Sequence, residues 1–304
     1  MNRKIRNITL GLSLLINSVA TGHEGCVMGL NSSSSVLPLN VNTMFFTQLQ
    51  MMQFNYTDPN LGYGNPVVFD QIYTSNSGLR WQHNSFFAST LSIPLKTSYR
   101  QTQNYGELTG GIGDIHVQFE FFDKRFLKDS SLVGLFRSSI DFGLPTGDYK
   151  RTGMDGLQLP IALQPGTGSW SQSVTASYIL MGAKYGFSST FNVMRFSTNQ
   201  QFYQLGTQVF ARVSGLRKFE YCGAMVLLDA GFSMLKAAND RQYGITLPNT
   251  GEVQGSASLK GVLSKGRFAW QAELGLPFYQ TSENVGGRLN HQLAVGLTYL
   301  FGDS

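Results

Sequence analysis

The chain has 304 residues, of which 42% are hydrophobic, 13% are charged and 34 are glycine. An ordinary soluble domain carries roughly 25% charged residues and ~7% glycine, so the chain is poor in charge and rich in glycine. The hydrophobic content excludes intrinsic disorder. Beyond residue 20 no apolar run approaches the roughly 20 residues of a membrane helix, which excludes a polytopic helical membrane protein. A transmembrane β-barrel or a secreted β-sandwich remains.

The N-terminus has the pattern of a secretory signal peptide. Basic residues at positions 3, 4 and 6 precede an apolar segment, Ile8 to Ile16, and the small residues Ser18-Val19-Ala20 follow. We predict cleavage after Ala20, because the apolar segment is too short to span a bilayer. Residues 1–20 contain three basic and no acidic residues, so the formal charge of +5 falls to +2 without them. No basic patch remains that would indicate a nucleic-acid partner.

The cysteines and histidines indicate neither a disulfide framework nor a metal site. Cys26 is expected in a tail and Cys222 inside a strand, so we do not expect them to form the one possible bridge. The four histidines are scattered singly and show no zinc-ligand spacing. We therefore expect no metal and no cofactor.

Alternating apolar and polar residues predict strands along the rest of the chain, because a barrel strand points successive side chains alternately to lipid and to lumen. The clearest segment is 113–122, in which Asp114, His116 and Glu120 share one face and apolar residues the other. In chain order, the predicted strands are 41–56, 66–74, 86–99, 113–122, 131–143, 171–181, 185–196, 203–214, 220–232, 252–263, 266–277 and 289–301. Strands of this length favour a membrane barrel over a sandwich, whose strands have about 5 or 6 residues.

The connections between these strands alternate in length, as those of outer-membrane barrels do. With the N-terminus in the periplasm, the predicted outer connections are 57–65, 100–112, 144–170, 197–202, 233–251 and 279–288. The predicted inner connections, most of them shorter, are 75–85, 123–130, 182–184, 215–219 and 264–265. An even strand number returns the C-terminus to the periplasm.

These features predict an all-β fold, a single antiparallel up-and-down transmembrane barrel of about twelve strands. We divide the chain into a signal peptide (1–20), a periplasmic tail (21–40), the barrel (41–301) and a C-terminal tail (302–304). The last strand ends in Tyr299 and Phe301, which resembles the terminal signal read by the barrel-assembly machinery. The expected location is the outer membrane of a Gram-negative bacterium, with that machinery, outer-membrane lipids and a small-molecule solute as partners.

The charged residues expected to face the lumen are the first candidate site. They are Lys96, Asp114, His116, Glu120, Arg137, Asp141, Arg212, Asp229, Lys260, Arg267 and Glu273. Their signs are mixed, so they do not indicate an ion-selective pore. Two interpretations remain open: the charges pair across the lumen, or some of them line a permeation path.

The long connection 144–170 is the second candidate site. Its middle is too apolar for a solvated loop, so we predict that the segment from Pro145 to Ser169 constricts the outer mouth and contacts the solute first. The alternative is an unstructured surface loop. The residues assigned to this mouth loop are Pro145, Gly147, Asp148, Tyr149, Leu157, Leu159, Ile161, Leu163 and Trp170.

Three motifs flank or open this region: Gly111-Ile112-Gly113-Asp114, Leu144-Pro145-Thr146-Gly147-Asp148-Tyr149 and Gly166-Thr167-Gly168-Ser169-Trp170. With them the sequence resembles the outer-membrane family named for the meta-cleavage pathway of phenol degradation. Members of that family resemble the long-chain fatty-acid and aromatic-hydrocarbon channels. The resemblance implies uptake of small, hydrophobic or aromatic molecules, and it assigns no substrate residues.

Two other functions compete with this one. A structural or adhesion barrel without transport activity would share the same strand pattern, but it should not admit solute. A barrel lipase needs a Ser/His pair on its lipid face, and His291 lies in phase with the outward residues of the last strand without a distinctive serine motif. We therefore expect no enzymatic activity.

Overall fold

The computed structural model describes residues 43–57, 67–102, 106–126, 132–153, 156, 158–248, 250–282 and 288–301. The predicted signal peptide, N-terminal tail and C-terminal tail, together with Cys26 and Leu157, lie outside the described residues. No helix among the described residues is long and apolar enough to cross a membrane.

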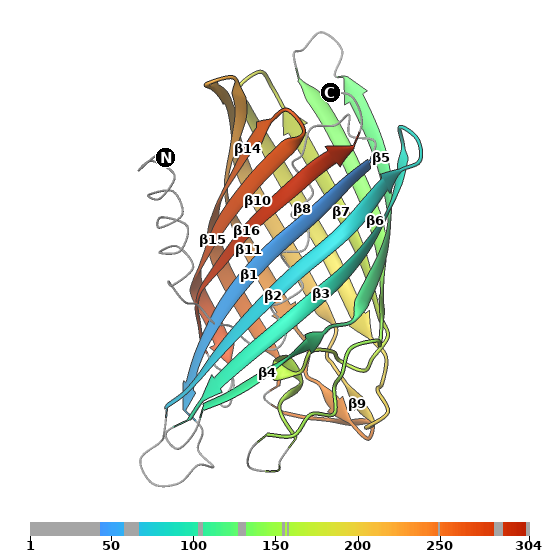
Figure 1. Cartoon of the computed structure of the whole chain (residues 1–304), viewed down its shortest axis with the longest axis vertical. Coiled ribbons are helices and arrows are strands. Elements are labelled where there is room, and N and C mark those ends of the chain that lie inside the picture. Colours follow the sequence, from blue (N-terminus) through green and yellow to red (C-terminus); the bar gives the residue numbers. More distant parts are fainter. Residues whose placement is uncertain are drawn as a thin grey trace, which may run out of the picture.

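The chain forms one closed antiparallel barrel of twelve spanning strands (Figure 1). The spanning strands are β1 (Thr43–Thr57), β2 (Val67–Gln82), β3 (Phe87–Gln101), β4 (Gly106–Ile112) with β5 (Ile115–Phe126), β6 (Val133–Leu144), β7 (Ser171–Met181), β8 (Tyr185–Phe196), β10 (Gln208–Tyr221), β11 (Ala224–Ala237), β14 (Glu252–Lys265), β15 (Phe268–Ser282) and β16 (Arg288–Phe301). Three short strands, β9 (Tyr203–Gln204), β12 (Arg241–Gln242) and β13 (Ile245–Thr246), form a separate sheet, and residues Ile161–Leu163 form the 3-10 helix η3. Pairing of β1 with β16 closes the barrel, which confirms the predicted fold class.

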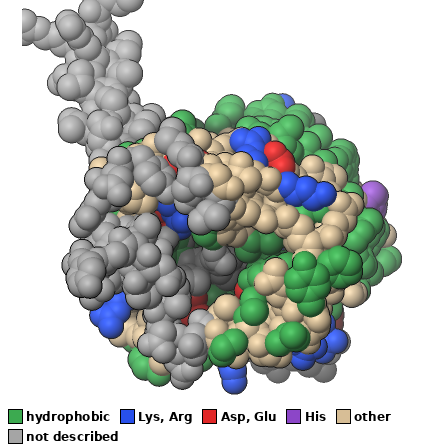
Figure 2. Space-filling view, turned by 90° about the horizontal axis from the view of Figure 1, so that it is seen from below, with side chains coloured by type: hydrophobic (Ala, Val, Ile, Leu, Met, Phe, Trp, Pro, Cys, Tyr) green, Lys and Arg blue, Asp and Glu red, His purple; other side chains and the backbone are tan. Residues whose placement is uncertain are grey.

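The two faces of each strand differ in character because every second side chain points to lipid. On β15, Trp270, Leu274 and Leu276 are exposed on the outer wall, whereas Ala269 and Glu273 are buried inside. Figure 2, which looks onto the end that carries the long connections, shows hydrophobic side chains around the outer wall. The apolar wall is the surface that a bilayer would cover.

The long connections lie at one end of the barrel, as predicted. The predicted outer connection 100–112 is wrong, because residues Gly106–Ile112 form β4. Among the described residues, short turns at the opposite end are 83–86, 182–184, 222–223 and 266–267. The long segments include 145–170, 197–207 and 238–251, which lie together below the barrel in Figure 1.

One predicted hairpin has the wrong boundaries. The expected turn at 215–219 lies within β10, where Gly215 pairs with Ala230, and the true turn is Cys222-Gly223. These two residues have φ of 51° and 71°, the left-handed values that a two-residue hairpin turn requires. Cys222 is therefore exposed in a turn, and its predicted position inside a strand is wrong.

The predicted end of the second strand is also wrong. Residues 75–82 belong to β2, which pairs with β3 along its whole length from Phe69 to Gln82. The small polar residues Ser75, Asn76 and Ser77 suggested a connection, but small side chains are accommodated inside the barrel. At Gly78 the absence of a side chain leaves room for the ring of Phe46.

The fourth spanning strand is interrupted at Gly113-Asp114. β3 pairs with β5 from Phe87 to Ser92 and with β4 from Leu95 to Gln101. Gly113 and Asp114, between β4 and β5, belong to neither strand. β6 ends at Leu144, opposite Ile115, so it runs alongside β5 and not β4. Within the described part of the chain, β4 pairs with β3 alone.

Candidate functional site: the mouth segment and the cavity beneath it

The mouth segment, residues 145–170, turns into the end of the barrel. Leu159 and Leu163 are 7% and 3% exposed and pack against inward-facing residues of β1, β2 and β16. This apolar cluster consists of Met52, Phe54, Ile72, Leu159, Ala162, Leu163 and Leu289. Ile161 packs on the other side, against a cluster that contains Met194, Phe196 and Leu205. The segment therefore buries its apolar residues inside the mouth, where water would otherwise surround them.

Gln164 fastens the two arms of the mouth segment to each other. Its side chain has no exposed surface. Its Oε1 accepts a hydrogen bond from the backbone N–H of Arg151 at 2.9 Å. Its Nε2 donates to the backbone oxygens of Leu159 at 2.9 Å and of Arg151 at 3.3 Å. The side chain thus adds to the single antiparallel bridge that Thr152 and Gln158 form between the two arms.

Asp114, at the interruption of the fourth strand, fastens the mouth segment to the barrel wall. One carboxylate oxygen accepts from the backbone N–H of Gly147 at 2.9 Å. The other accepts from Thr167, through its N–H at 2.8 Å and its hydroxyl at 2.7 Å. These donors come from both ends of the segment, so the carboxylate of Asp114 holds both ends of the segment to the barrel wall. Asp114 was assigned to the lumen wall, and its role in the structure is to hold the mouth segment.

A cavity of about 790 Å³, including its open mouth, lies beneath the segment. We call it the mouth cavity. It is lined by Thr74, Asn76, Pro94, Lys96, Asp114, His116, Ile161, Ala162, Gln164, Pro165, Gly166, Thr167, Phe196, Leu205 and Gln208. Its lining combines apolar side chains with polar ones, as small-molecule sites do.

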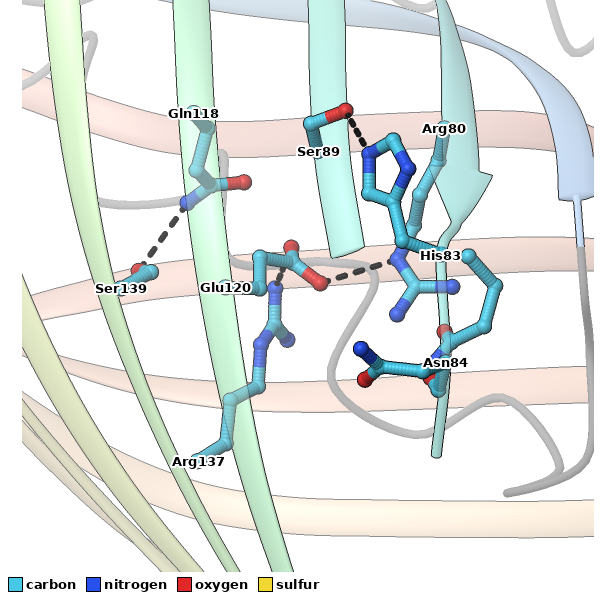
Figure 3. Close-up of polar contacts among 9 residues, drawn as sticks. Arg80, His83, Asn84, Ser89, Gln118, Glu120, Arg137 and Ser139 are labelled. Carbon is cyan, nitrogen blue, oxygen red and sulfur yellow. Dashed lines mark hydrogen bonds and ion pairs between the residues drawn. The ribbon is translucent and has the colours of Figure 1, made fainter. Parts of the chain in front are cut away.

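Deeper in the lumen, charged side chains form two paired networks. Glu120 is 1% exposed and bonds to Arg80 at 2.9 Å and to Arg137 (Figure 3). Arg80 also lies over the ring of Phe122, 5.1 Å from its centroid. Gln118, on the same strand as Glu120, donates to Ser139 at 3.1 Å.

The second network spans the strands on the other side of the barrel. Arg212 bonds to Asp229 at 2.9 Å and to Glu273 at 2.8 Å. Lys260 stands between these two acids in the register of β11, β14 and β15. The burial of these charges is offset by opposite charges within hydrogen-bond distance, which favours the interpretation that they pair across the lumen.

The remaining predicted lumen residues divide between the cavity and the barrel end. His116 bonds to Asp141 at 2.8 Å and lines the mouth cavity together with Lys96. Arg267 is exposed in the turn 266–267, beyond the last pair of the ladder, so its assignment to the lumen is wrong.

Three inward-facing residues that form ion pairs, Asp70, Arg80 and Arg100, escape the sequence analysis. Asp70 and Arg100 form a two-point ion pair at 2.9 and 2.8 Å on neighbouring strands. Arg80 was missed because the predicted strand stops at residue 74. Continuing the alternation from Asp70 through Thr74 places Arg80 on the inner face, so the signal was present in the sequence.

The other mouth-loop residues lie nearer the surface. Asp148 forms an exposed ion pair with Arg151 at 2.8 Å, and the hydrogen bond from Arg151 lowers the pKa of the Asp148 carboxyl. Pro145 and Tyr149 are partly buried, and Trp170 is 58% exposed at the start of β7.

One Ser/His contact is present at the short-turn end. His83 and Ser89 are joined at 2.7 Å (Figure 3), and the imidazole stacks on Phe87. No carboxylate is hydrogen-bonded to His83 in the described part of the chain, so the pair lacks the acid of a triad. His291, singled out from the sequence, is partly exposed on β16.

No protein-family model matches the chain, and no curated protein matches it. Solved structures share its β-barrel fold. The COG4313 outer membrane channel from Pseudomonas putida F1 aligns with a TM-score of 0.65 and 14% identity, covering 86% of this chain and 96% of that one. The translocator domain of the autotransporter NalP from Neisseria meningitidis aligns with a TM-score of 0.45 and 12% identity, covering 89% and 92%.

The first alignment shows that the chain has the fold of an outer-membrane channel. It agrees with the resemblance to an outer-membrane channel family that the three sequence motifs suggest. The shared fold agrees with the expected location in the outer membrane of a Gram-negative bacterium.

Proposed function

We propose that the protein is a channel through which small, hydrophobic or amphipathic molecules enter the cell, and that it carries out no chemical conversion. The observation that carries the proposal is the seating of Leu159 and Leu163 inside the barrel mouth, above a cavity with largely apolar walls. A solute that enters there can take over the apolar contacts that the mouth segment makes with itself and with the barrel wall. The likeness to the channel from Pseudomonas putida F1 supports the same function.

The networks around Glu120 and Arg212 line the inner wall with paired side chains. Such a lumen should carry little ionic current, since twelve strands enclose less space than the 16 to 18 strands of open porins. We therefore expect small planar-bilayer currents without strong ion selectivity. A large, stable current would contradict the proposal and indicate a general porin.

The direct test is deletion of residues 152–164, which leaves both flanking motifs in place. In reconstituted vesicles the deletion should raise the uptake of apolar solutes, while the heat-modifiable mobility of the folded barrel stays intact. A matched control replaces the same residues with a Gly/Ser linker of equal length, which should have the same effect if the apolar contacts close the mouth.

The competing function is a structural or adhesion barrel. It predicts that neither the intact protein nor the deletion variant admits any member of a panel of aromatic and aliphatic solutes. That outcome would overturn the channel proposal.

A further inference from the structure

The wall of the mouth cavity holds two polar side chains whose oxygens have no partner. Thr74 is 8% exposed, and its Oγ1 makes no hydrogen bond. The Oδ1 of Asn76, two residues along β2 on the same inward face, is also buried and makes none. Each such group costs about 1–3 kcal/mol when it is removed from water without a partner. The two oxygens, two residues apart on one wall of the cavity, are hydrogen-bonding groups that a molecule in the cavity could engage.

Apolar side chains from the mouth segment, from β8 and from the connection after β8 line the same cavity. Thr74, Asn76, Ile161, Phe196 and Leu205 all line the same cavity. A molecule that fills it would therefore meet polar atoms on the β2 wall and the hydrocarbon of Ile161, Phe196 and Leu205 elsewhere, with the amide of Gln208 beside them. This arrangement fits an amphipathic molecule with its head group toward β2.

The charges at the cavity are already engaged. Asp114 accepts three hydrogen bonds from the mouth segment, and His116 is paired with Asp141. Lys96 also interacts with another group of the protein. A carboxylate head would have to compete for these groups, whereas a neutral hydroxyl can donate to Asn76 Oδ1 and accept from the hydroxyl of Thr74.

We propose that the mouth cavity binds an amphipathic solute with a neutral hydroxyl head group, held by Thr74 and Asn76, and with its apolar body between Ile161, Phe196 and Leu205. The inference rests on the proposed channel function and names the class of solute for the same site.

The test compares three probes of similar length: 1-octanol, which donates and accepts; 1-methoxyheptane, which only accepts; and octanoate, which is charged. Saturable binding to the full-length barrel in nanodiscs is measured by ligand-observed NMR, with empty nanodiscs as the blank. We expect 1-octanol to bind most tightly. Replacing Thr74 with Val removes one neutral hydrogen bond and should weaken 1-octanol binding about 3- to 10-fold.

The chain provides a matched control in Thr90. Its Oγ1 is also buried and unpartnered, but Thr90 does not line the mouth cavity. Thr90→Val should therefore leave 1-octanol binding unchanged, and Thr74→Ser, which keeps the hydroxyl, should restore it. Asn76→Leu should abolish the preference for 1-octanol over the ether.

The outcomes separate this inference from the proposed function. Tighter binding of octanoate, or equal binding of alcohol and ether with no effect of Thr74→Val, would overturn the head-group assignment even if vesicles admit all three probes. Failure of the native protein to bind or admit any probe would overturn the channel function as well. If Thr74→Val fails to give the folded, heat-modifiable barrel, the comparison of Asn76→Leu with the native protein decides the assignment.

Discussion

The closed position of the mouth segment should depend on Gln164. Replacing Gln164 with Leu keeps the volume of the side chain but removes its three hydrogen bonds to the backbone of Arg151 and Leu159. At about 1 kcal/mol for each bond, the closed state loses about 3 kcal/mol relative to an open state in which water satisfies the same groups. This corresponds to a shift of about 100-fold in the ratio of closed to open segments.

The assay is solute influx into reconstituted vesicles, together with single-channel recording in planar bilayers. Gln164→Leu should raise the rate of influx and the fraction of time spent open. The matched control is Gln118→Leu, because Gln118 bonds to Ser139 on the barrel wall and does not line the mouth cavity. Unchanged influx and open time in Gln164→Leu, with the barrel folded, would refute the argument that these bonds close the mouth.

Three further predictions test other parts of the structure. Glu120→Gln leaves two buried arginines without their acid and should destabilise the barrel by about 3–5 kcal/mol, seen as a lower midpoint of heat-modifiable mobility; an unchanged midpoint would show that the network is not needed. Asp114→Ala releases both arms of the mouth segment and should increase its cleavage by externally added protease, whereas equal cleavage would argue that other contacts hold the arms. In a Cys26→Ser background, a membrane-impermeant maleimide should label the exposed Cys222 only after the outer membrane is permeabilised; labelling in intact cells would reverse the predicted orientation.

The barrel itself is predictable from the sequence because a two-residue period ties each side chain to one face of a strand. Lipid requires apolar residues at every second position, so the inward direction of Glu120, Arg137, Arg212 and Asp229 follows from the alternation alone. The prediction is wrong where local composition mimics a turn. The small polar residues from 75 to 78 resemble a connection, although they pair with β3.

Turn positions are less well determined by sequence than strand faces. Gly215 suggested a turn, yet it lies in the middle of β10, and the chain reverses instead at Cys222-Gly223. A glycine permits left-handed φ without requiring it. The pairing of both strands with their other neighbours, β8 and β14, fixes where the hairpin turns.

The partners across the lumen and the site in the mouth depend on the closed barrel. Arg80 meets Glu120, 40 residues away, and Arg212 meets Glu273, 61 residues away, only because the registers of the intervening strands bring them together. The composition of the mouth segment predicts that its leucines avoid water at the mouth, but it does not predict which surface covers them. The space that twelve strands leave at their mouth determines which surface covers these leucines. It also determines that Thr74 and Asn76 share a cavity with Ile161.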